Sequence, residues 1–530
     1  MNFFIKDILF VASALLVAAS ACAPKGGNGS ASAPSDSIAS ADSALALRQH
    51  AELTPFPDTI FPSAAEVKYT IEIADSTPGN LSSLNDLYVG APGAFTFRCG
   101  ARRDADFGGR LDSVPTHFEI DWSFETDEDF TPTKVGTWGG GTGWTGQPLY
   151  VEWPDSVKAR FKEKNLSFAA QEIMVGSLSG RVYFIDFATG KASRKAINTQ
   201  NPIKGTLSLD PTLNGNLYVG QGLSAHVPVG ALVIDLFRHD ITHFFGKDPK
   251  AQRGWEAYDS SPVRVGQFLF RPGENGTLYK FIISPGSLKL HSALRYRCNG
   301  AAPGMEASMA VCRNYGFTAD NHGNILCINL NTLAPVWHYK LPDDTDSTPV
   351  VAEEADGGVY IYTGCEVEHA GVTRATFVKL DALTGREVWV NRVEAQRKDI
   401  GEKHFDGGFY STALLGRGDC EDLIFINVVQ NTDGQNGSFM ALDRRTGKTV
   451  YSTPLRHYAW SSPVGFLTSQ RRQMVVTGDC AGNLYLIDGR SGNIIDRQSV
   501  GNNFESSPVV SGNSLVVGSR GKTIYKISLK

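Results

Sequence analysis

Short hydrophobic runs separated by turn residues recur along most of this chain, and their repetition predicts its fold. Five runs share one plan, in which a strand rich in β-branched and aromatic residues ends at Asp or Asn, usually before a Thr-Gly or Ser-Gly turn: 182–186, 325–329, 377–381, 439–443 and 484–488. The Asp side chain can cap such a turn, and its Gly accepts a positive φ. Self-similarity at about 50 residues is typical of a propeller or a repeat array.

Two further strands precede most of these runs. The nearer strand ends in a tight Gly-bearing turn and therefore forms a hairpin with the run that follows it. The earlier strand opens with Ser-Ser-Pro-Val or a relative, where Pro at the first residue of a strand costs no ladder hydrogen bond. These openings begin at Ser260, Ser347, Ser411, Ser461 and Ser506.

Counting the middle strand of each unit gives eight: 172–178, 216–222, 267–273, 315–320, 358–364, 422–429, 473–479 and 514–520. The sequence therefore predicts an all-β fold over residues 115–530, an eight-bladed β-propeller of four-stranded antiparallel blades. The last unit stops at Leu529 without a fourth strand, whereas a lone strand at 117–124 precedes the first unit. We expect this N-terminal strand to pair with the C-terminal blade and close the ring, because closure protects the sheet edges.

The N-terminal region predicts export and lipid anchoring. Residues 1–21 have a lipoprotein signal peptide's features, with Lys6 before an apolar stretch at 8–19. The small residues before Cys22 resemble a bacterial lipobox and predict lipidation of that thiol, with ordinary cleavage after Ala21 as the alternative. We expect residues 22–60 to be a flexible tether, because 23–43 is almost all Ala, Ser, Gly and Pro, and residues 61–114 to be an N-terminal extension. No later apolar run approaches the ~20 residues of a membrane-spanning helix.

Composition narrows the function classes. A net charge of -5 argues against a nucleic-acid-binding protein, which would carry a basic stripe. The cysteines after Cys22 include no Cys-x-x-Cys pair, which argues against zinc-ribbon and thioredoxin sites. Some of them could be oxidised in an exported chain, and Cys327, within a buried strand pattern, is expected to be a core residue.

One repeat resembles a known family. The run 378–389, Val-Lys-Leu-Asp-Ala-Leu-Thr-Gly-Arg-Glu-Val-Trp, resembles the tryptophan-docking repeat of the pyrroloquinoline-quinone (PQQ) propellers, and the strand openings are similar across residues 115–530. In that family the Trp of one blade packs over the Gly-containing turn of its neighbour. Trp337 and Trp389 stand at that position, whereas Tyr451 and Asp496 replace it elsewhere. We therefore expect a degraded docking girdle.

The resemblance implies one of two functions. Quinoprotein dehydrogenases hold PQQ on the axis against a disulfide between adjacent cysteines, with calcium bound beside it. No two cysteines are adjacent here and no segment aligns with the calcium ligands, so we expect neither PQQ nor calcium. The other branch resembles the propeller lipoprotein of the outer-membrane β-barrel assembly machinery, which carries no cofactor and docks to proteins. We expect a non-enzymatic, lipid-anchored, protein-binding scaffold in the bacterial cell envelope at the outer membrane. The alternative is a propeller of quinoprotein oxidoreductase type that binds PQQ or another small molecule.

Propeller geometry gathers the loops that enter the innermost strands at one mouth of the central channel. In this chain those loops are rich in aromatic residues, which provide large rigid contact area, and in polar groups that could orient a ligand. We predict a recognition surface there, formed by Trp138, Trp144, Trp255, Tyr258, His457, Tyr458 and Trp460. The alternative for Trp138 and Trp144 is that they only pack the entry to the first blade.

Other candidates for chemistry are weaker. Acidic residues just before successive inner strands predict a ring of carboxylates at the mouth, whose expected role is to cap backbone donors: Glu306, Asp346, Asp406 and Glu505. His404, Asp406 and His457 match no metal-binding spacing, and we predict no metal site. The glycine run at 139–143 is not a phosphate loop, because no Gly-Lys-Ser/Thr follows it. Without a Gly-x-Ser-x-Gly elbow we predict no catalytic residue.

Overall fold

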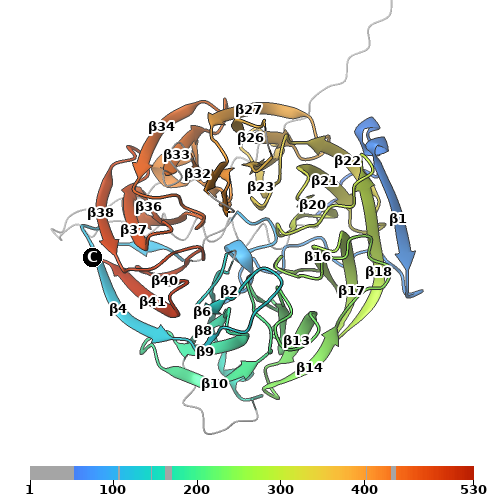
Figure 1. The fold of residues 1–530 in the computed structure, drawn as a ribbon, viewed down its shortest axis with the longest axis horizontal. Coiled ribbons are helices and arrows are strands. Elements are labelled where there is room, and N and C mark those ends of the chain that lie inside the picture. The colour runs from blue at the N-terminus through green and yellow to red at the C-terminus, as the bar shows by residue number, and fades with distance from the viewer. Residues whose placement is uncertain are drawn as a thin grey trace, which may run out of the picture. The chain divides into compact units, whose positions relative to one another are not determined.

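The computed structural model describes residues 53–104, 108–144, 146–161, 170–369, 371–400, 403–430 and 437–530, with the backbone alone at 398–400 and 403–405. Across these ranges eight small antiparallel sheets form a ring, and the chain runs once around it from blue to red in Figure 1. The predicted eight-bladed, all-β propeller is confirmed. The predicted lipidation site at Cys22 lies outside the described residues and stays a prediction.

The first four blades are listed from the axis outward. Blade 1 contains β7 (Leu149–Glu152), β8 (Gln171–Gly176), β9 (Arg181–Asp186) and β10 (Ala192–Asn198). Blade 2 contains β11 (Ser208–Leu209), β12 (Asn216–Gly220), β13 (Ala231–Asp235) and β14 (Asp240–Phe245). Blade 3 contains β15 (Val263–Val265), β16 (Phe268–Gly273), β17 (Thr277–Ser284) and β18 (Ser287–Cys298). Blade 4 contains β19 (Ala310–Cys312), β20 (Tyr315–Ala319), β21 (Asn324–Asn329) and β22 (Pro335–Lys340).

The other four blades follow the same order. Blade 5 contains β23 (Val350–Glu353), β24 (Val359–Gly364), β26 (Arg374–Asp381) and β27 (Glu387–Glu394). Blade 6 contains β31 (Leu414–Leu415), β32 (Leu423–Val429), β33 (Gly437–Asp443) and β34 (Thr449–Leu455). Blade 7 contains β35 (Val464–Thr468), β36 (Gln473–Gly478), β37 (Asn483–Asp488) and β38 (Ile494–Ser499). Blade 8 contains β39 (Val509–Ser511), β40 (Ser514–Gly518), β41 (Thr523–Leu529) and β4 (Phe118–Glu125).

Additional strands and short helices lie outside the four-stranded blades. Three strands of the N-terminal extension add to blades 3, 1 and 7 respectively: β1 (Val67–Ile73), β2 (Gly93–Ala94) and β3 (Arg110–Leu111). Small ladders join β5 (Glu128–Asp129) to β6 (Gly139–Gly140), β25 (Glu366–Val367) to β30 (Gly407–Gly408), and β28 (Lys398–Ile400) to β29 (Lys403–Phe405). The described helices are η1 (Pro62–Glu66), η2 (Phe97–Cys99), α2 (Asp155–Lys158) and η3 (Gly418–Cys420). None of them could cross a membrane.

Both faces of each blade pack against neighbours, which explains why the middle strands are hydrophobic without alternation. Every residue of β36 is buried. Met474 and Val476 pack with residues of blade 8, whereas Val475 between them packs with residues of blade 6. Successive side chains of a strand point to opposite faces, so one run supplies two interblade cores. Cys327 has no exposed surface and lies in such a core, as predicted.

The ring closes as the sequence predicts. Strand β4 pairs antiparallel with β41, from Phe118 opposite Leu529 to Glu125 opposite Thr523. In Figure 1 the cyan β4 lies along the outside of the red C-terminal blade. The N-terminal strand therefore supplies the fourth strand of blade 8 and covers the edge of β41.

Aromatic docking stabilises several junctions between blades. The rings of Trp337, Trp389 and Tyr451 pack directly over Gly385, Gly447 and Gly492 of the following blade, respectively. The same contact, which the sequence did not predict, occurs at the closure: Trp122 of β4 packs over Gly190 of blade 1. Its indole N–H donates to the Phe187 carbonyl at 3.0 Å. The docking girdle thus continues across the joint between the two ends of the propeller.

Five hydrogen bonds join adjacent blades near the axis, where the inner strands begin. In each case a backbone N–H donates to the hydroxyl of the equivalent residue in the next blade, at 2.8–3.0 Å: Gln147 to Thr206, Ser261 to Ser308, Ser308 to Thr348, Thr412 to Ser462, and Ser462 to Ser507. These bonds explain why the strand openings repeat Ser or Thr. They also place the residue just before each opening at one level of the ring.

The N-terminal extension fills the axis of the propeller. Residues 93–103 run along the innermost strands, pairing Gly93 with Val151 of blade 1. The carbonyls of Phe95, Ala101 and Arg102 accept backbone hydrogen bonds from blades 2, 4 and 5. The blue segment at the centre of Figure 1 is this part of the chain.

Two buried arginines fix this axial segment. Arg103 is fully buried and donates to the carbonyls of Met309 and Ser261 at 2.8 and 3.0 Å. Arg98 donates to the carbonyls of Pro463 and Ala413 at 2.7 and 3.3 Å. Burial lowers the pKa of Arg103 to about 10. Arg103 therefore ties blades 3 and 4 to the axial segment, and Arg98 ties blades 6 and 7 on the opposite side of the ring.

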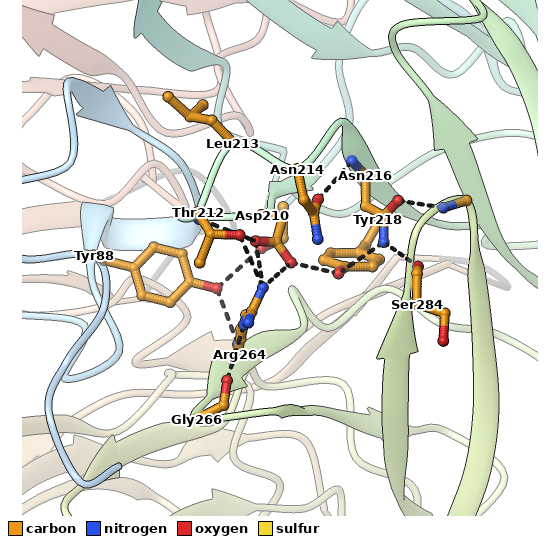
Figure 2. Close-up of polar contacts among 12 residues, drawn as sticks. Tyr88, Asp210, Thr212, Leu213, Asn214, Asn216, Tyr218, Arg264, Gly266 and Ser284 are labelled. Atoms are coloured by element: carbon orange, nitrogen blue, oxygen red, sulfur yellow. Dashed lines mark hydrogen bonds and ion pairs between the residues drawn. The ribbon is translucent and has the colours of Figure 1, made fainter. Parts of the chain in front are cut away.

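A buried polar network joins the extension to blades 2 and 3 at the far ends of their inner strands (Figure 2). The Asp210 carboxylate accepts hydrogen bonds from Arg264 at 2.6 and 2.7 Å and from the Tyr218 hydroxyl at 2.7 Å. The Tyr88 hydroxyl of the extension accepts a hydrogen bond from the Arg264 backbone N–H at 3.0 Å. Because the carboxylate is paired and hydrogen-bonded, we interpret this network as structural.

Candidate functional site

The candidate site lies at the mouth of the propeller, where the chain enters each innermost strand. The axial hydrogen bonds described above align the strand openings, so the residue before each opening occupies an equivalent place. In blades 2 to 8 these residues are Lys204, Asp259, Glu306, Asp346, Tyr410, Trp460 and Glu505. Acidic residues therefore gather on blades 3 to 5, and aromatic residues on blades 6 and 7.

Four aromatic rings form one cluster, here called the aromatic cluster: Trp144, Tyr410, Tyr458 and Trp460. Trp460 stacks on Tyr410 with ring centroids 5.0 Å apart, and it also contacts Tyr458 at 5.5 Å. Trp144 reaches across from blade 1 to contact Tyr410 and Trp460, both at 5.6 Å. Such offset and edge contacts hold rings rigidly.

One polar atom of this cluster has no partner. The indole N–H of Trp460 is buried, and none of the residues that the structure describes accepts a hydrogen bond from it. A buried donor without an acceptor costs roughly 1–3 kcal/mol. The aromatic cluster therefore presents a hydrogen-bond donor that a bound partner or water could satisfy.

A cluster around one lysine occupies blades 2 to 4. The Lys204 ammonium forms ion pairs with Asp259 and, at 3.1 Å, with Glu306. Burial opposes the charge on Lys204, but these carboxylates raise its pKa well above the usual value. Glu274 completes the group and accepts a hydrogen bond from the Trp255 indole N–H at 2.6 Å. Burial and then the charge of Glu306 raise the pKa of Glu274 well above its usual range.

A second set of carboxylates, here called the acidic cluster, consists of Asp344, Asp346 and Glu366. Their ligand-type oxygens all lie within 4.8 Å of one another. Asp346 and Glu366 are only 7% and 4% exposed. Burial first, and then the neighbouring carboxylates, raise the pKa of all three groups well above the usual range.

The structure brings together part of the predicted recognition surface. Trp144, Tyr458 and Trp460 meet in the aromatic cluster, and His457 is partly exposed directly before Tyr458. Trp138 and Trp255 lie on the lysine side of the mouth: the Lys204 ammonium is 5.7 Å from the Trp138 ring centroid, and Trp255 binds Glu274. Whether these residues recognise a ligand stays a prediction.

Tyr258 differs from the other predicted residues because it is only 2% exposed and packs in the core between blades 2 and 3. Its backbone also contacts blade 2, since its N–H donates to the Gln221 carbonyl at 2.9 Å. The pattern Trp-x-x-Tyr before Asp259 gave no signal that would separate the buried ring from the partly exposed Trp255.

The predicted ring of carboxylates forms in part. Glu306 and Asp346 lie at the mouth, but their expected capping role is not what the described contacts show, because Glu306 binds Lys204 and Asp346 belongs to the acidic cluster. Glu505 accepts from Arg520 at 3.0 Å, and Asp406 lies 3.7 Å from Arg397. The side chain of His404 lies outside the described residues.

Sequence reasoning missed Lys204, Glu274 and Glu366. Lys204 was detectable, since Lys204-Gly-Thr206 occupies the place that Asp259-Ser-Ser261 occupies one blade later. Glu274 and Glu366 follow the middle strands β16 and β24 rather than preceding an inner strand. Only the fold brings the ends of those strands to the mouth.

The sequence was compared with family models and with curated proteins. A family model described as outer membrane protein assembly factor BamB matches residues 435–530, which include blade 7 and three of the four strands of blade 8. The resemblance to PQQ-like propellers is confirmed. No curated protein matches the sequence.

Solved structures with low sequence identity share the propeller fold. A europium-containing methanol dehydrogenase aligns with a TM-score of 0.57 at 12% identity, covering 83% of this chain and 98% of its own. The quinohemoprotein alcohol dehydrogenase from Comamonas testosteroni aligns with a TM-score of 0.58 at 13% identity, and the alignment covers 84% of this chain and 82% of the dehydrogenase. BamB from Moraxella catarrhalis aligns at 15% identity with a TM-score of 0.48, and the alignment covers 78% of this chain and 99% of BamB. At these identities the alignments show the fold alone.

Proposed function

We propose that this PQQ-like propeller is a non-enzymatic, protein-binding scaffold of the bacterial cell envelope that contributes to outer-membrane protein assembly. A lipid on Cys22 would hold it at the outer membrane, and the tether at 22–60 would let the propeller reach its partners. The match of residues 435–530 to the model of an outer-membrane assembly factor supports this class of function.

The aromatic cluster is the observation that carries the proposal. Large rigid rings dominate the binding energy of many protein interfaces, and a central aromatic anchor often contributes about 2 kcal/mol or more. Trp460 also offers an indole N–H with no acceptor among the described residues. A partner that packs on these rings and supplies a carbonyl or carboxylate would satisfy that donor.

A second candidate function is binding of PQQ or another small molecule in the manner of a quinoprotein oxidoreductase. It is favoured by the convergence of aromatic rings and carboxylates at one mouth, which is typical of ligand sites. The residues do not fit PQQ as the dehydrogenases hold it, because no two cysteines are adjacent in the sequence and the disulfide on which PQQ stacks cannot form. The axial segment 93–103 also occupies the channel between the inner strands. We therefore infer that PQQ is not bound.

The test of the scaffold function uses the aromatic cluster in cells. A strain that lacks the protein is complemented with wild type, Trp460→Phe or Trp460→Ala. Outer-membrane β-barrel proteins are then quantified, together with the envelope proteins that co-purify after crosslinking. Trp460→Phe keeps an aromatic ring in the stack and removes the unpartnered N–H, so its melting temperature should be close to wild type. We expect Trp460→Phe to recover partners less well than wild type. We expect Trp460→Ala to lose roughly 30-fold in affinity for the partner, equivalent to about 2 kcal/mol.

The matched control is Phe244→Ala, which removes an aromatic ring that is 49% exposed on the outer strand β14 and outside the aromatic cluster. It should retain every partner. Normal β-barrel levels in the strain lacking the protein would contradict the assembly role. Full partner recovery by both Trp460 variants would show that the interface lies elsewhere.

A further inference from the structure

We propose that the acidic cluster, Asp344, Asp346 and Glu366, is a binding site for a hard divalent cation of the Ca²⁺ type. The site differs from the recognition surface proposed above, and the inference stands whether or not the propeller is an assembly scaffold.

The spacing of the three carboxylates suits one shared ion. Calcium binds carboxylate oxygens at about 2.3–2.6 Å, so two oxygens on one ion lie at most about 5 Å apart. The ligand-type oxygens of Asp344, Asp346 and Glu366 all fall within 4.8 Å of one another. Carboxylate-rich sites of this kind suit calcium, magnesium or manganese rather than soft metals. Burial by protein groups favours calcium, because magnesium usually keeps several of its waters.

The carboxylates lack a described counter-charge. Glu366 is 4% exposed, and its Oε1 atom has no hydrogen-bond partner among the described residues. The Oδ1 atom of Asp344 is likewise buried and unpartnered within the described part of the chain. Buried ionised carboxylates without a partner are very costly, so such a cluster binds either protons or a cation.

Two comparable groups at the same mouth already have a basic side chain as an ion-pair partner. Asp259, Glu274 and Glu306 surround the Lys204 ammonium, which supplies a positive charge. In the third group, Asp343 accepts the backbone N–H groups of Glu368 and His369 at 2.9 Å and also pairs with the His369 ring. The acidic cluster is the group left without such a partner among the residues that the structure describes.

The backbone holds the three ligands in place. The Glu366 N–H donates to the Asp344 carbonyl at 2.8 Å, which joins two of the ligand residues directly. Glu366 also pairs with Gly408 across the short ladder of β25 and β30. A Cβ atom at Gly408 would lie 2.5 Å from the Glu366 Cα, so only glycine permits this approach. Preorganised ligands lose little conformational entropy when an ion binds.

The test uses the full chain, freed of metal with a chelator. Ca²⁺ is titrated at pH 7.5 while the melting temperature is recorded. Tb³⁺, a calcium substitute, is titrated with excitation of the aromatic cluster, because Tyr410 lies beside Glu366 and Trp460 stacks on Tyr410. We expect saturable Tb³⁺ luminescence that Ca²⁺ displaces. We also expect Ca²⁺ to raise the melting temperature.

The variants are Glu366→Gln and Asp346→Asn, with Glu274→Gln as the matched control from the lysine-bound cluster. Each test variant should lose at least roughly tenfold in Ca²⁺ affinity. Each metal-free variant should keep a single cooperative unfolding transition, which reports correct folding. The control should keep its Ca²⁺ response.

Three results would overturn the proposal. One is wild-type protein with no saturable response to either ion. Another is a response that Glu366→Gln and Asp346→Asn retain unchanged. The third is equal loss in Glu274→Gln, which would assign the ion to the lysine-bound cluster instead.

Discussion

Replacing Trp122 with Ala should destabilise the joint between the two ends of the propeller. Trp122 is partly buried over Gly190 of blade 1, and its indole N–H donates to the Phe187 carbonyl. Losing that hydrogen bond costs about 1 kcal/mol. Truncating a fully buried Trp to Ala costs about 3–5 kcal/mol, so the loss of packing at this half-buried ring is about 2 kcal/mol. The free energy of unfolding should fall by about 3 kcal/mol in total.

The assay is urea unfolding combined with hydrogen exchange of the amides in β4 and β41. Trp122→Phe keeps most of the packing and should lose only about 1 kcal/mol, the share of the hydrogen bond. Trp389→Ala is the matched control, since Trp389 makes the same contact over Gly447 between blades 5 and 6. It should lower overall stability without faster exchange in β4. If Trp122→Ala loses less than about 1 kcal/mol and leaves exchange in β4 and β41 unchanged, the ring does not depend on this contact for closure.

Three further predictions concern the anchor, the axis and the cofactor. Cys22→Ser should abolish metabolic labelling with a fatty acid and release the protein from membranes, whereas persistent labelling would contradict the lipobox. Arg103→Met should lower the free energy of unfolding by about 3 kcal/mol, because buried carbonyls would lose a charged donor. Arg103→Lys should not restore that stability, because an ammonium lacks the guanidinium fork. Wild-type stability in either variant would contradict this role. PQQ added with calcium should give no saturable absorbance change beyond that of calcium alone, and a calcium-dependent PQQ titration would favour the second candidate function.

The fold was predictable because each blade repeats a local pattern. Buried strands, Asp-capped turns and Ser-Thr openings are properties of short segments, so the middle strands could be located without knowing their neighbours. The closure was also predictable, since a unit that ends at Leu529 lacks a fourth strand and the run 117–124 lacks a unit. The axial segment was not, because residues 93–103 belong to no repeat and their partners lie in most of the blades.

The candidate site divides in the same way. The repeat placed Trp144, Trp460 and Asp346 near the mouth, because each precedes an inner strand. The repeat pattern gave no information about which of these side chains contact one another. It also grouped Tyr258, which is buried, with residues that are partly exposed.

By itself, the sequence determined the number of blades, the order of their strands and the way in which the ring closes, because these follow from local hydrophobic periodicity and turn chemistry. The tertiary structure decided what fills the axis, where Trp122 docks, and which charges remain without a partner at the mouth. Those features depend on distances between residues far apart in the chain: Glu366 approaches Asp344 and Asp346 through a loop and a two-residue ladder rather than through a repeat. No local pattern records such distances, since they arise only when the blades pack around a common axis.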